Sequence, residues 1–159
     1  MSDSSLAKAT VFVVDDDQAM RNSLKWLIES VGVAVESFSS ADEFLAQYQP
    51  GRTGCLVLDV RMPGMSGLEL LEHLAQKNVH IPAVIITGHG DVPMAVRAMK
   101  SGAIDFIEKP FNDEALLDAI RRAIAFEEQQ RSYHSEHVQI QGRLAHLTPR
   151  EHEDRKSVV

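Results

Sequence analysis

The sequence predicts an α/β fold, in which a doubly wound parallel sheet of five strands carries helices on both faces. Between residues 10 and 126, short apolar runs rich in Val and Ile alternate with longer segments of helical spacing. Such short apolar runs are typical of strands buried on both faces of a sheet. Strand–helix alternation repeated five times implies parallel strands with helices on both faces.

The expected strands have the length of fully buried strands, 4 to 8 residues. Sheets of this kind place their functional sites at the carboxyl ends of the strands. The residues that follow each strand are therefore the first candidates for a site. The strands occupy residues 10–14, 34–38, 55–59, 83–87 and 105–108.

The helices between the strands are predicted from apolar residues three and four positions apart. Ser40 is expected to cap one helix, with Glu43 three residues later completing a capping box. In the segment 18–31 the apolar residues are Met20, Leu24, Leu27, Ile28 and Val31. In the next clear helix they are Leu68, Leu70, Leu71 and Leu74, and in the one after it they are Val96 and Met99.

The last helix is expected to be unusually long. It begins near Asn112 or Asp113 and meets no strong stop before Pro149, which gives about 35 residues or roughly 50 Å. Its first turns present three apolar residues to the sheet, Leu117, Ile120 and Ile124. A second stripe forms a heptad seam with two polar positions, and the alternative is a polar linker helix that frays in solution. The seam comprises Leu116, Ala119, Ala123, Phe126, Gln130, Tyr133, His137, Ile140, Leu144 and Leu147.

Residues 148–151, Thr-Pro-Arg-Glu, read as the opening of a further helix. Thr is a good N-cap, Pro is favoured at the first helical position, and Glu stands where a capping box needs it. From His152 onward the sequence has no apolar face. We therefore expect the start of a second domain whose remainder this chain lacks.

The composition excludes several classes of protein. Hydrophobic residues make up 44% and charged residues 25%, which argues against a disordered chain. The net charge is −7 and neither 1–112 nor 113–159 is basic, so the electrostatic footprint of a nucleic-acid binder is missing. A single cysteine, Cys55, excludes an internal disulfide and a Cys-based zinc site. Without an apolar run of about 18 residues or a secretory signal, we expect a cytoplasmic protein with no membrane association.

Polar side chains stand at the ends of four expected strands, and these ends meet at one edge of the sheet. Carboxylates that converge on one point repel each other, so they require a cation, and hard oxygen ligands select Mg²⁺. A hydroxyl and an ammonium beside them suit phosphoryl oxygens. This set predicts attack by a carboxylate on phosphorus, which gives an aspartyl phosphate. The side chains are Asp15, Asp16, Asp59, Thr87 and Lys109.

Taken singly, these residues have ordinary interpretations. Asp15 and Asp16 fit helix caps or solvated acids, and Asp17 is itself expected to cap the helix that follows. Lys109 alone fits a surface lysine. Their combination at four strand ends in this order carries the prediction.

In this order the motifs resemble the receiver domain of bacterial response regulators. The matching stretches are Asp15-Asp16, Leu-Asp-Val-Arg-Met-Pro-Gly-Met-Ser-Gly around Asp59, Thr-Gly-His-Gly-Asp from Thr87, and Asp-Phe-Ile-Glu-Lys-Pro-Phe ending at Phe111. The resemblance covers about residues 8–128 and is closest to the FixJ-like branch. That branch carries a LuxR-type DNA-binding effector, whose first helix opens with Leu-Thr-Pro-Arg-Glu, as residues 147–151 do.

The resemblance implies a flavodoxin-like sheet of order 2-1-3-4-5 and a role for each site residue. Asp59 would be the phosphoacceptor, and Thr87 and Lys109 would bind its phosphoryl group. Phe106 would be the switch aromatic, and Lys109–Pro110 would be a cis peptide bond. Mg²⁺ would be held by Asp15, Asp16, Asp59 and the backbone carbonyl of Arg61.

The resemblance also implies the function. A sensor histidine kinase would phosphorylate Asp59, and the altered protein would form a homodimer and switch a DNA-binding effector in the parent protein. Such a protein assists its own phosphorylation and dephosphorylation but is not a turnover enzyme. The expected division is a receiver at 8–128, a helical linker at 129–147 and the start of the effector at 148–159.

Two alternatives remain at this stage. A phosphatase of the haloacid-dehalogenase type also forms an aspartyl phosphate, but its nucleophile lies in an Asp-x-Asp motif on the first strand, whereas Asp59 ends the third. A binding module that is never phosphorylated would lack a key residue, and none is missing here. Catalytic release of phosphate from small substrates would identify the phosphatase.

Overall fold

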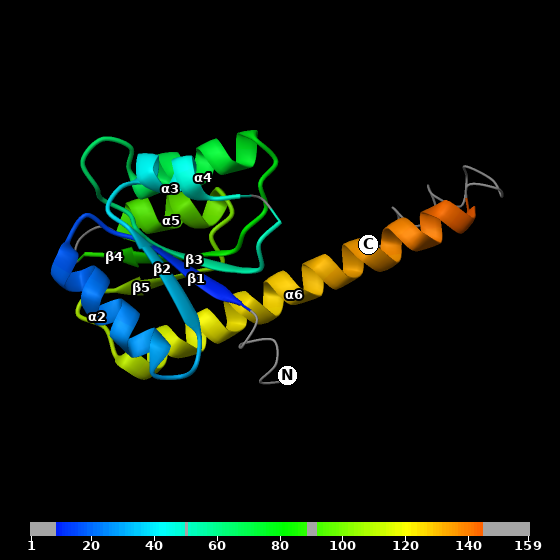
Figure 1. Ribbon diagram of the computed structural model, residues 1–159. Coiled ribbons are helices and arrows are strands. Elements are labelled where there is room, and N and C mark those ends of the chain that lie inside the picture. The colour runs from blue at the N-terminus through cyan, green and yellow to red at the C-terminus, as the bar shows by residue number, and fades with distance from the viewer. Residues whose placement is uncertain (1–8, 50, 89–91, 145–159) are drawn as a thin grey trace. The chain divides into compact units, whose positions relative to one another are not determined.

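The structure is a computed structural model that describes residues 9–49, 51–88 and 92–144, with side chains described as far as Gln130. Within these residues, five strands alternate with five helices (Figure 1). All five expected strands are present, and one of them begins a residue earlier than expected, at Gly54. In chain order the elements are β1 (Thr10–Val14), α2 (Gln18–Glu29), β2 (Ala34–Phe38), α3 (Ala41–Gln47), β3 (Gly54–Asp59), α4 (Gly67–Gln76), β4 (Ala83–Thr87), α5 (Val92–Lys100), β5 (Asp105–Glu108) and α6 (Asp113–Leu144).

The five strands form one parallel sheet in the order β2-β1-β3-β4-β5. This confirms the predicted fold class and strand order. Gly54 opens β3 opposite Thr10 with φ +142°, and a Cβ at this position would lie 1.8 Å from the Thr10 carbonyl oxygen. Only glycine fits so close an approach, so a residue type that usually weakens strands begins this one.

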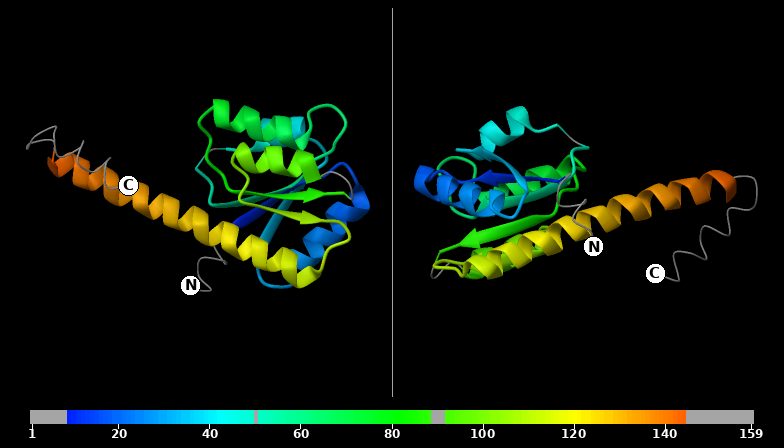
Figure 2. Two further views of the ribbon diagram at one scale, coloured as in Figure 1. Left: turned by 180° about the vertical axis from the view of Figure 1, so that it is seen from behind. Right: turned by 60° about the horizontal axis from the view of Figure 1, so that its bottom comes forward.

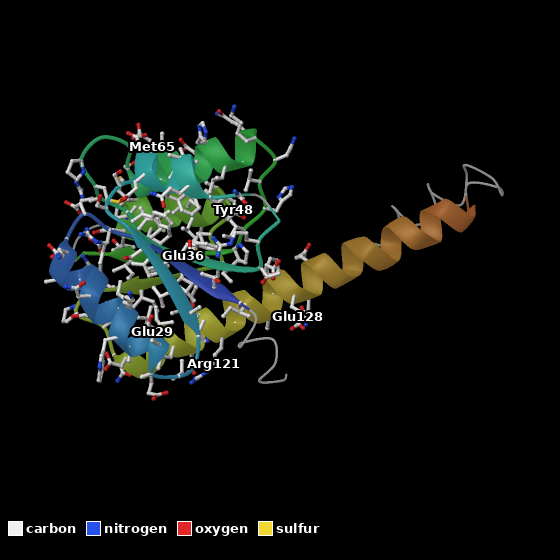
Figure 3. All side chains as sticks on the ribbon, viewed as in Figure 1. Glu29, Glu36, Tyr48, Met65, Arg121 and Glu128 are labelled. Carbon is white, nitrogen blue, oxygen red and sulfur yellow. The ribbon has the colours of Figure 1, made fainter. Side chains whose placement is uncertain are left out.

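The sheet lies between two layers of helices, α3, α4 and α5 on one face and α2 and α6 on the other (Figures 1 and 2). Successive strand residues point to opposite faces. In β1, for example, Phe12 and Val14 belong to the core under α3–α5, and Val11 and Val13 to the core under α2 and α6. Side chains fill both sides of the sheet (Figure 3). Burial on both faces explains why the central strands β1, β3 and β4 are almost continuously apolar. The edge strands correct the prediction of buried strands, because most residues of β2 and β5 are half-buried or exposed.

The inward face of α5 differs from the prediction, which placed Val96 and Met99 there. Ala95 and Ala98 are fully buried, while Val96 and Met99 are 44% and 37% exposed. Small residues on the inner face allow the helix to lie close to the sheet, so the larger apolar residues are left outside. With Val92, they form an exposed apolar stripe on α5.

The helix α6 begins as expected, because the Asn112 side chain accepts hydrogen bonds from the amides of Glu114 and Ala115. Leu117, Ile120 and Ile124 are buried, as predicted. The prediction of an exposed seam is wrong for its first three residues, because they are fully buried in the core. These residues are Leu116, Ala119 and Ala123.

The later part of the seam starts with Phe126, which is 42% exposed. The seam side chains from Tyr133 to Leu147 and the segment 148–159 lie outside the described side chains. The chain divides into two compact units, Met1–Glu127 and Glu128–Val159. None of the described helices combines the length and apolarity that crossing a membrane requires.

The helix caps give one further correction. The Ser40 side chain accepts from the Glu43 amide, as expected, but the Glu43 carboxylate accepts from the amide and hydroxyl of Ser39, so the box is not reciprocal. A complete capping box is formed instead by Ser66 and Glu69 at the start of α4. It fixes the helix that follows the loop after Asp59.

Candidate functional site

Three carboxylates converge at the carboxyl edge of the sheet. Asp15 and Asp16 follow β1, and Asp59 ends the adjacent strand β3. One carboxylate oxygen of each residue lies within 4.8 Å of the others. Asp15 and Asp59 are buried, whereas Asp16 is exposed. The strand ends that the sequence placed together are therefore together in the structure.

The bonding of Asp15 leaves one oxygen free. Its amide donates to the Phe38 carbonyl at 3.1 Å, which continues the pairing of β1 with β2. Its Oδ1 accepts from the Asp17 amide at 2.9 Å, and its carbonyl oxygen accepts from Arg21 Nη1 at 2.7 Å. Its Oδ2 is buried and has no hydrogen-bond partner among the described residues. Burial, and then the nearby Asp59 charge, raise the pKa of Asp15 to about 6, against the opposing effects of the Asp17 amide and Lys109.

Asp59 lies between a backbone donor and a cation. Its Oδ1 accepts from the Arg61 amide at 3.1 Å, and its Oδ2 lies 3.5 Å from Lys109 Nζ. Burial raises the pKa of Asp59, and both of these neighbours oppose the increase. In this arrangement the carboxylate is desolvated but keeps an exit to solvent, since it is 8% exposed.

Thr87 and Lys109 are connected directly. Thr87 ends β4 and is fully buried, and its hydroxyl donates to the Gly88 carbonyl at 3.4 Å. The Lys109 amide donates to the Thr87 carbonyl at 2.8 Å, so the backbone of Thr87 also holds the backbone of Lys109 in place. The Lys109–Pro110 peptide bond is cis, as the resemblance implied.

Phe106 lies on β5 opposite Ile85, half-buried against the core under α3–α5. It thus lies on the strand that Lys109 follows, next to the strand that Thr87 ends, and does not belong to the acidic cluster. The residues proposed for the chemistry lie at one edge of the sheet, and Phe106, the proposed switch aromatic, lies outside the acidic cluster.

Sequence reasoning missed two residues that shape the site. The first residue is Arg21, which contacts the Asp15 backbone. The sequence indicates it only as a positively charged residue in the first turns of the helix that follows the acidic loop. The second residue is Gly67, where a Cβ would lie 2.3 Å from the Asp59 carbonyl oxygen and 2.9 Å from the Val60 Cα. The start of α4 therefore packs directly against the backbone of Asp59.

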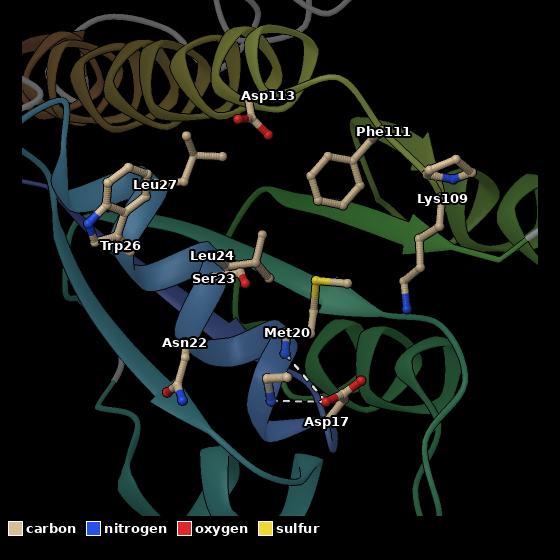
Figure 4. A pocket seen from close by; sticks show the side chains of 12 residues that line it. Asp17, Met20, Asn22, Ser23, Leu24, Trp26, Leu27, Lys109, Phe111 and Asp113 are labelled. Carbon is tan, nitrogen blue, oxygen red and sulfur yellow. Dashed lines mark hydrogen bonds between the residues drawn. The ribbon is translucent and has the colours of Figure 1, made fainter.

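A groove of about 920 Å³ adjoins the acidic cluster. Figure 4 shows Met20, Leu24 and Leu27 of α2 on one side and Phe111 on the other. Trp26, which is 74% exposed, lies at one end, and Asp17 and Lys109 lie at the end near the cluster. The groove thus runs from an apolar surface to the acidic edge.

The residues present fit a divalent cation. The donor set is all oxygen, two of the three carboxylates are buried, and Asp15 Oδ2 has no partner among the described residues. Mg²⁺ prefers carboxylate oxygens, and a cation would remove the repulsion between these groups. Such a site combines a cation position, a buried carboxylate and a lysine.

The fold and site together define an α/β module with a carboxylate centre at the carboxyl edge of its sheet. The profile described as the response regulator receiver domain matches residues 11–121. The chain belongs to this family, whose members are signalling proteins.

Curated relatives support this assignment. The chain is 51% identical over 144 residues to Nodulation protein W of Bradyrhizobium diazoefficiens, covering 91% of this chain and 63% of that protein. It is 48% identical over 141 residues to the transcriptional regulatory protein FixJ of Azorhizobium caulinodans, covering 89% and 67%. The chain therefore spans about two thirds of the length of these relatives.

Solved structures agree with the fold. The response regulator StyR aligns with a TM-score of 0.81 and 50% identity, over 92% of this chain and 74% of that one. Full-length FixJ from B. japonicum aligns with a TM-score of 0.73 and 44% identity, over 91% and 71%.

Proposed function

We propose that this chain is a phosphorylation-controlled receiver that accepts a phosphoryl group on Asp59 from a sensor histidine kinase. The observation that carries the proposal is the position of Asp59, a buried carboxylate beside two further acids and 3.5 Å from Lys109 Nζ. In the transfer, the phosphorus–nitrogen bond of a phosphohistidine breaks and a bond forms between phosphorus and an Asp59 oxygen. Histidine leaves with the electron pair of the broken bond.

The proposed cation ligands are Asp15, Asp16, Asp59 and the Arg61 carbonyl. Bound Mg²⁺ would supply positive charge that offsets the charge of the phosphoryl oxygens. Asp15 would contribute its unpartnered oxygen, directly or through water. Without the cation, repulsion between the carboxylates and the negatively charged phosphoryl oxygens would oppose the transfer.

Lys109 and Thr87 have separate proposed roles. The Lys109 ammonium pairs with Asp59 before transfer and would pair with a phosphoryl oxygen afterwards. The Thr87 hydroxyl, which donates to the Gly88 carbonyl at 3.4 Å, would turn to donate to the phosphoryl group. The movement of Thr87 would open space for Phe106, the proposed switch aromatic, on the adjacent strand.

The groove beside the acidic edge suits the donor protein. Its apolar walls on α2 and at Phe111 lead directly to Lys109 (Figure 4). A helix carrying the phosphohistidine would bury apolar residues against these walls while its histidine faces Asp59. We therefore propose the groove as the kinase-docking surface.

The output is proposed to be self-association followed by control of an effector. The exposed stripe of Val92, Val96 and Met99 gives α5 an apolar surface for a homodimer formed on phosphorylation. In a longer protein, residues 8–128 would be the receiver, 129–147 the linker helix and 148–159 the start of a DNA-binding effector of the LuxR type. The relatives named as transcriptional regulators support this proposal. The chain itself would not act as a turnover enzyme.

Mass spectrometry after incubation with acetyl phosphate and Mg²⁺ tests the proposal. We expect wild type to gain the mass of one phosphoryl group and Asp59→Asn to gain none. Asp17→Asn is the matched control: Asp17 is exposed and caps α2, a role that Asn fills equally well, so this variant should be labelled like wild type. Equal labelling of Asp59→Asn and wild type would place the acceptor elsewhere.

A further inference from the structure

Arg21 lies beside the acidic cluster without being one of its proposed ligands. It is half-buried on α2, and its Nη1 donates to the Asp15 carbonyl oxygen at 2.7 Å. Its positive charge also helps to lower the pKa of Glu43, a carboxylate held by the amide and hydroxyl of Ser39. The guanidinium therefore lies against the loop after β1.

The loop after β1 needs such a partner. Sheet pairing fixes the chain as far as the Asp15 amide, which donates to the Phe38 carbonyl. The Asp15 carbonyl lies one step beyond the strand, where the sheet no longer supplies a donor. A buried carbonyl without a partner is unfavourable, so the Arg21 donor decides which way this peptide group faces.

With Arg21 in place, Asp15 is held at three points. Its amide, its carbonyl and its Oδ1 are each hydrogen-bonded, to Phe38, Arg21 and Asp17. Only the buried Oδ2 is left without a partner among the described residues. Groups that orient a metal ligand contribute to affinity although they never touch the metal.

The geometry points to Arg21 as a positioning residue of the cation site, which fixes the peptide after Asp15 and so holds the Asp15 carboxylate in the acidic cluster. This inference rests on the proposed function, because it assumes that the cluster binds Mg²⁺. It adds a residue that contacts neither the cation nor the phosphoryl group.

The sign of the effect separates positioning from simple electrostatics. Removing a positive charge near a cation site reduces repulsion of the cation, so electrostatics alone predicts tighter Mg²⁺ binding by an Arg21→Met variant. Positioning predicts weaker binding. Lys25, exposed on the same helix one turn later, is the matched control, since Lys25→Met removes a charge without touching the Asp15 backbone.

The experiment is calorimetric titration of the full 159-residue chain with MgCl₂ alone, near neutral pH. We expect Arg21→Met to weaken Mg²⁺ binding by about 10-fold, the lower end for groups that orient metal ligands. Arg21→Lys, which keeps one donor on a flexible stem, should bind with intermediate affinity. Lys25→Met should bind at least as tightly as wild type. Amide NMR shifts of Asp15 and Asp16 in EDTA should move in Arg21→Met and stay in Lys25→Met.

Three results would overturn the inference or its basis. Arg21→Met that binds Mg²⁺ as tightly as wild type, or more tightly, would overturn the inference and leave Asp59 phosphorylation intact. If Arg21→Met has no cooperative thermal transition, Arg21→Lys decides, and wild-type affinity in that variant overturns the inference. Wild type that binds no Mg²⁺ would remove the cation from the proposed function and the inference with it.

Discussion

Asp15 carries an electrostatic cost that the folded protein bears when no cation is bound. Burial raises its pKa from 3.8 to about 6, so the folded state holds the proton more tightly than the unfolded state does. The tighter binding of this proton stabilises the folded state fully below pH 3.8, and this stabilisation is lost as the pH rises through about 6. The shift corresponds to about 3 kcal/mol of unfolding free energy.

Asp15→Asn should therefore gain stability relative to wild type as the pH rises, because Asn cannot ionise. We expect the difference in unfolding free energy to move in favour of the variant by up to about 3 kcal/mol between about pH 4 and about pH 7.5 in EDTA. Urea unfolding at both pH values measures this. A difference in unfolding free energy that does not depend on pH would contradict the assigned cause.

Gly67 should not tolerate alanine, although alanine is otherwise the better helix residue by about 1 kcal/mol. The added Cβ would meet the Asp59 carbonyl oxygen at 2.3 Å, and backbone atoms cannot rotate away as a side chain can. We expect Gly67→Ala to lower the unfolding free energy by about 1–3 kcal/mol, as overpacking does. It should also weaken Mg²⁺ binding.

The control for Gly67 is Gly32, which has φ +86° and no neighbour within 4 Å of a built Cβ. Gly32→Ala should lose stability through backbone strain alone, about 1 kcal/mol. Its Mg²⁺ affinity should equal that of wild type. Equal effects of both variants on Mg²⁺ binding would show that Gly67 does not set the position of Asp59.

Among the elements, the strands could be predicted to within a residue and the buried faces of α2, α4 and the start of α6 largely so, whereas the inner face of α5 could not. A strand buried on both faces leaves a continuous apolar run, such as residues 83–87. The inner face of α5 consists of Ala95 and Ala98, and alanine carries little positional signal. Larger residues at Val96 and Met99 dominated the pattern but face solvent.

The residues of the site also differ in how far the sequence predicts their positions. Strand ends could be predicted, so Asp59, Thr87 and Lys109 could be placed at one edge from the sequence alone. The contact of Arg21 with the Asp15 carbonyl could not, because it depends on where a long side chain reaches after α2 has packed. Contacts between a side chain and backbone across a loop leave no periodic pattern.

The orientation of α5 gives a test at the level of the element. Ala98→Leu should lower the unfolding free energy by about 1–3 kcal/mol, because a larger side chain must fit between α5 and the sheet. Val96→Ser should change it by less than about 0.5 kcal/mol, as exposed substitutions do. Thermal or urea unfolding of both variants measures the contrast. The reverse order would restore the orientation that the sequence suggested.

For the whole molecule, the last buried core residue among those described is Ile124. A chain that ends at Glu128 should therefore keep its fold, with an unfolding free energy within about 0.5 kcal/mol of the full chain, since it loses no described core residue. Urea unfolding of both chains tests this. A large loss of stability would mean that the second unit contributes to the stability of the first. The heptad seam expected beyond Phe126 stays a prediction, because the unfolding of these two chains does not test whether its side chains pair.

Trp26 gives the protein a built-in optical reporter. It is the single tryptophan of the chain, 74% exposed at one end of the groove beside α2. An indole in water emits at long wavelength, and covering it shifts the emission toward the blue. A kinase helix that occupies the groove should therefore shift the fluorescence, whereas Mg²⁺ should leave the emission wavelength unchanged, because Trp26 is not part of the acidic cluster. A titration read at one emission band would separate donor docking from cation binding in a single cuvette.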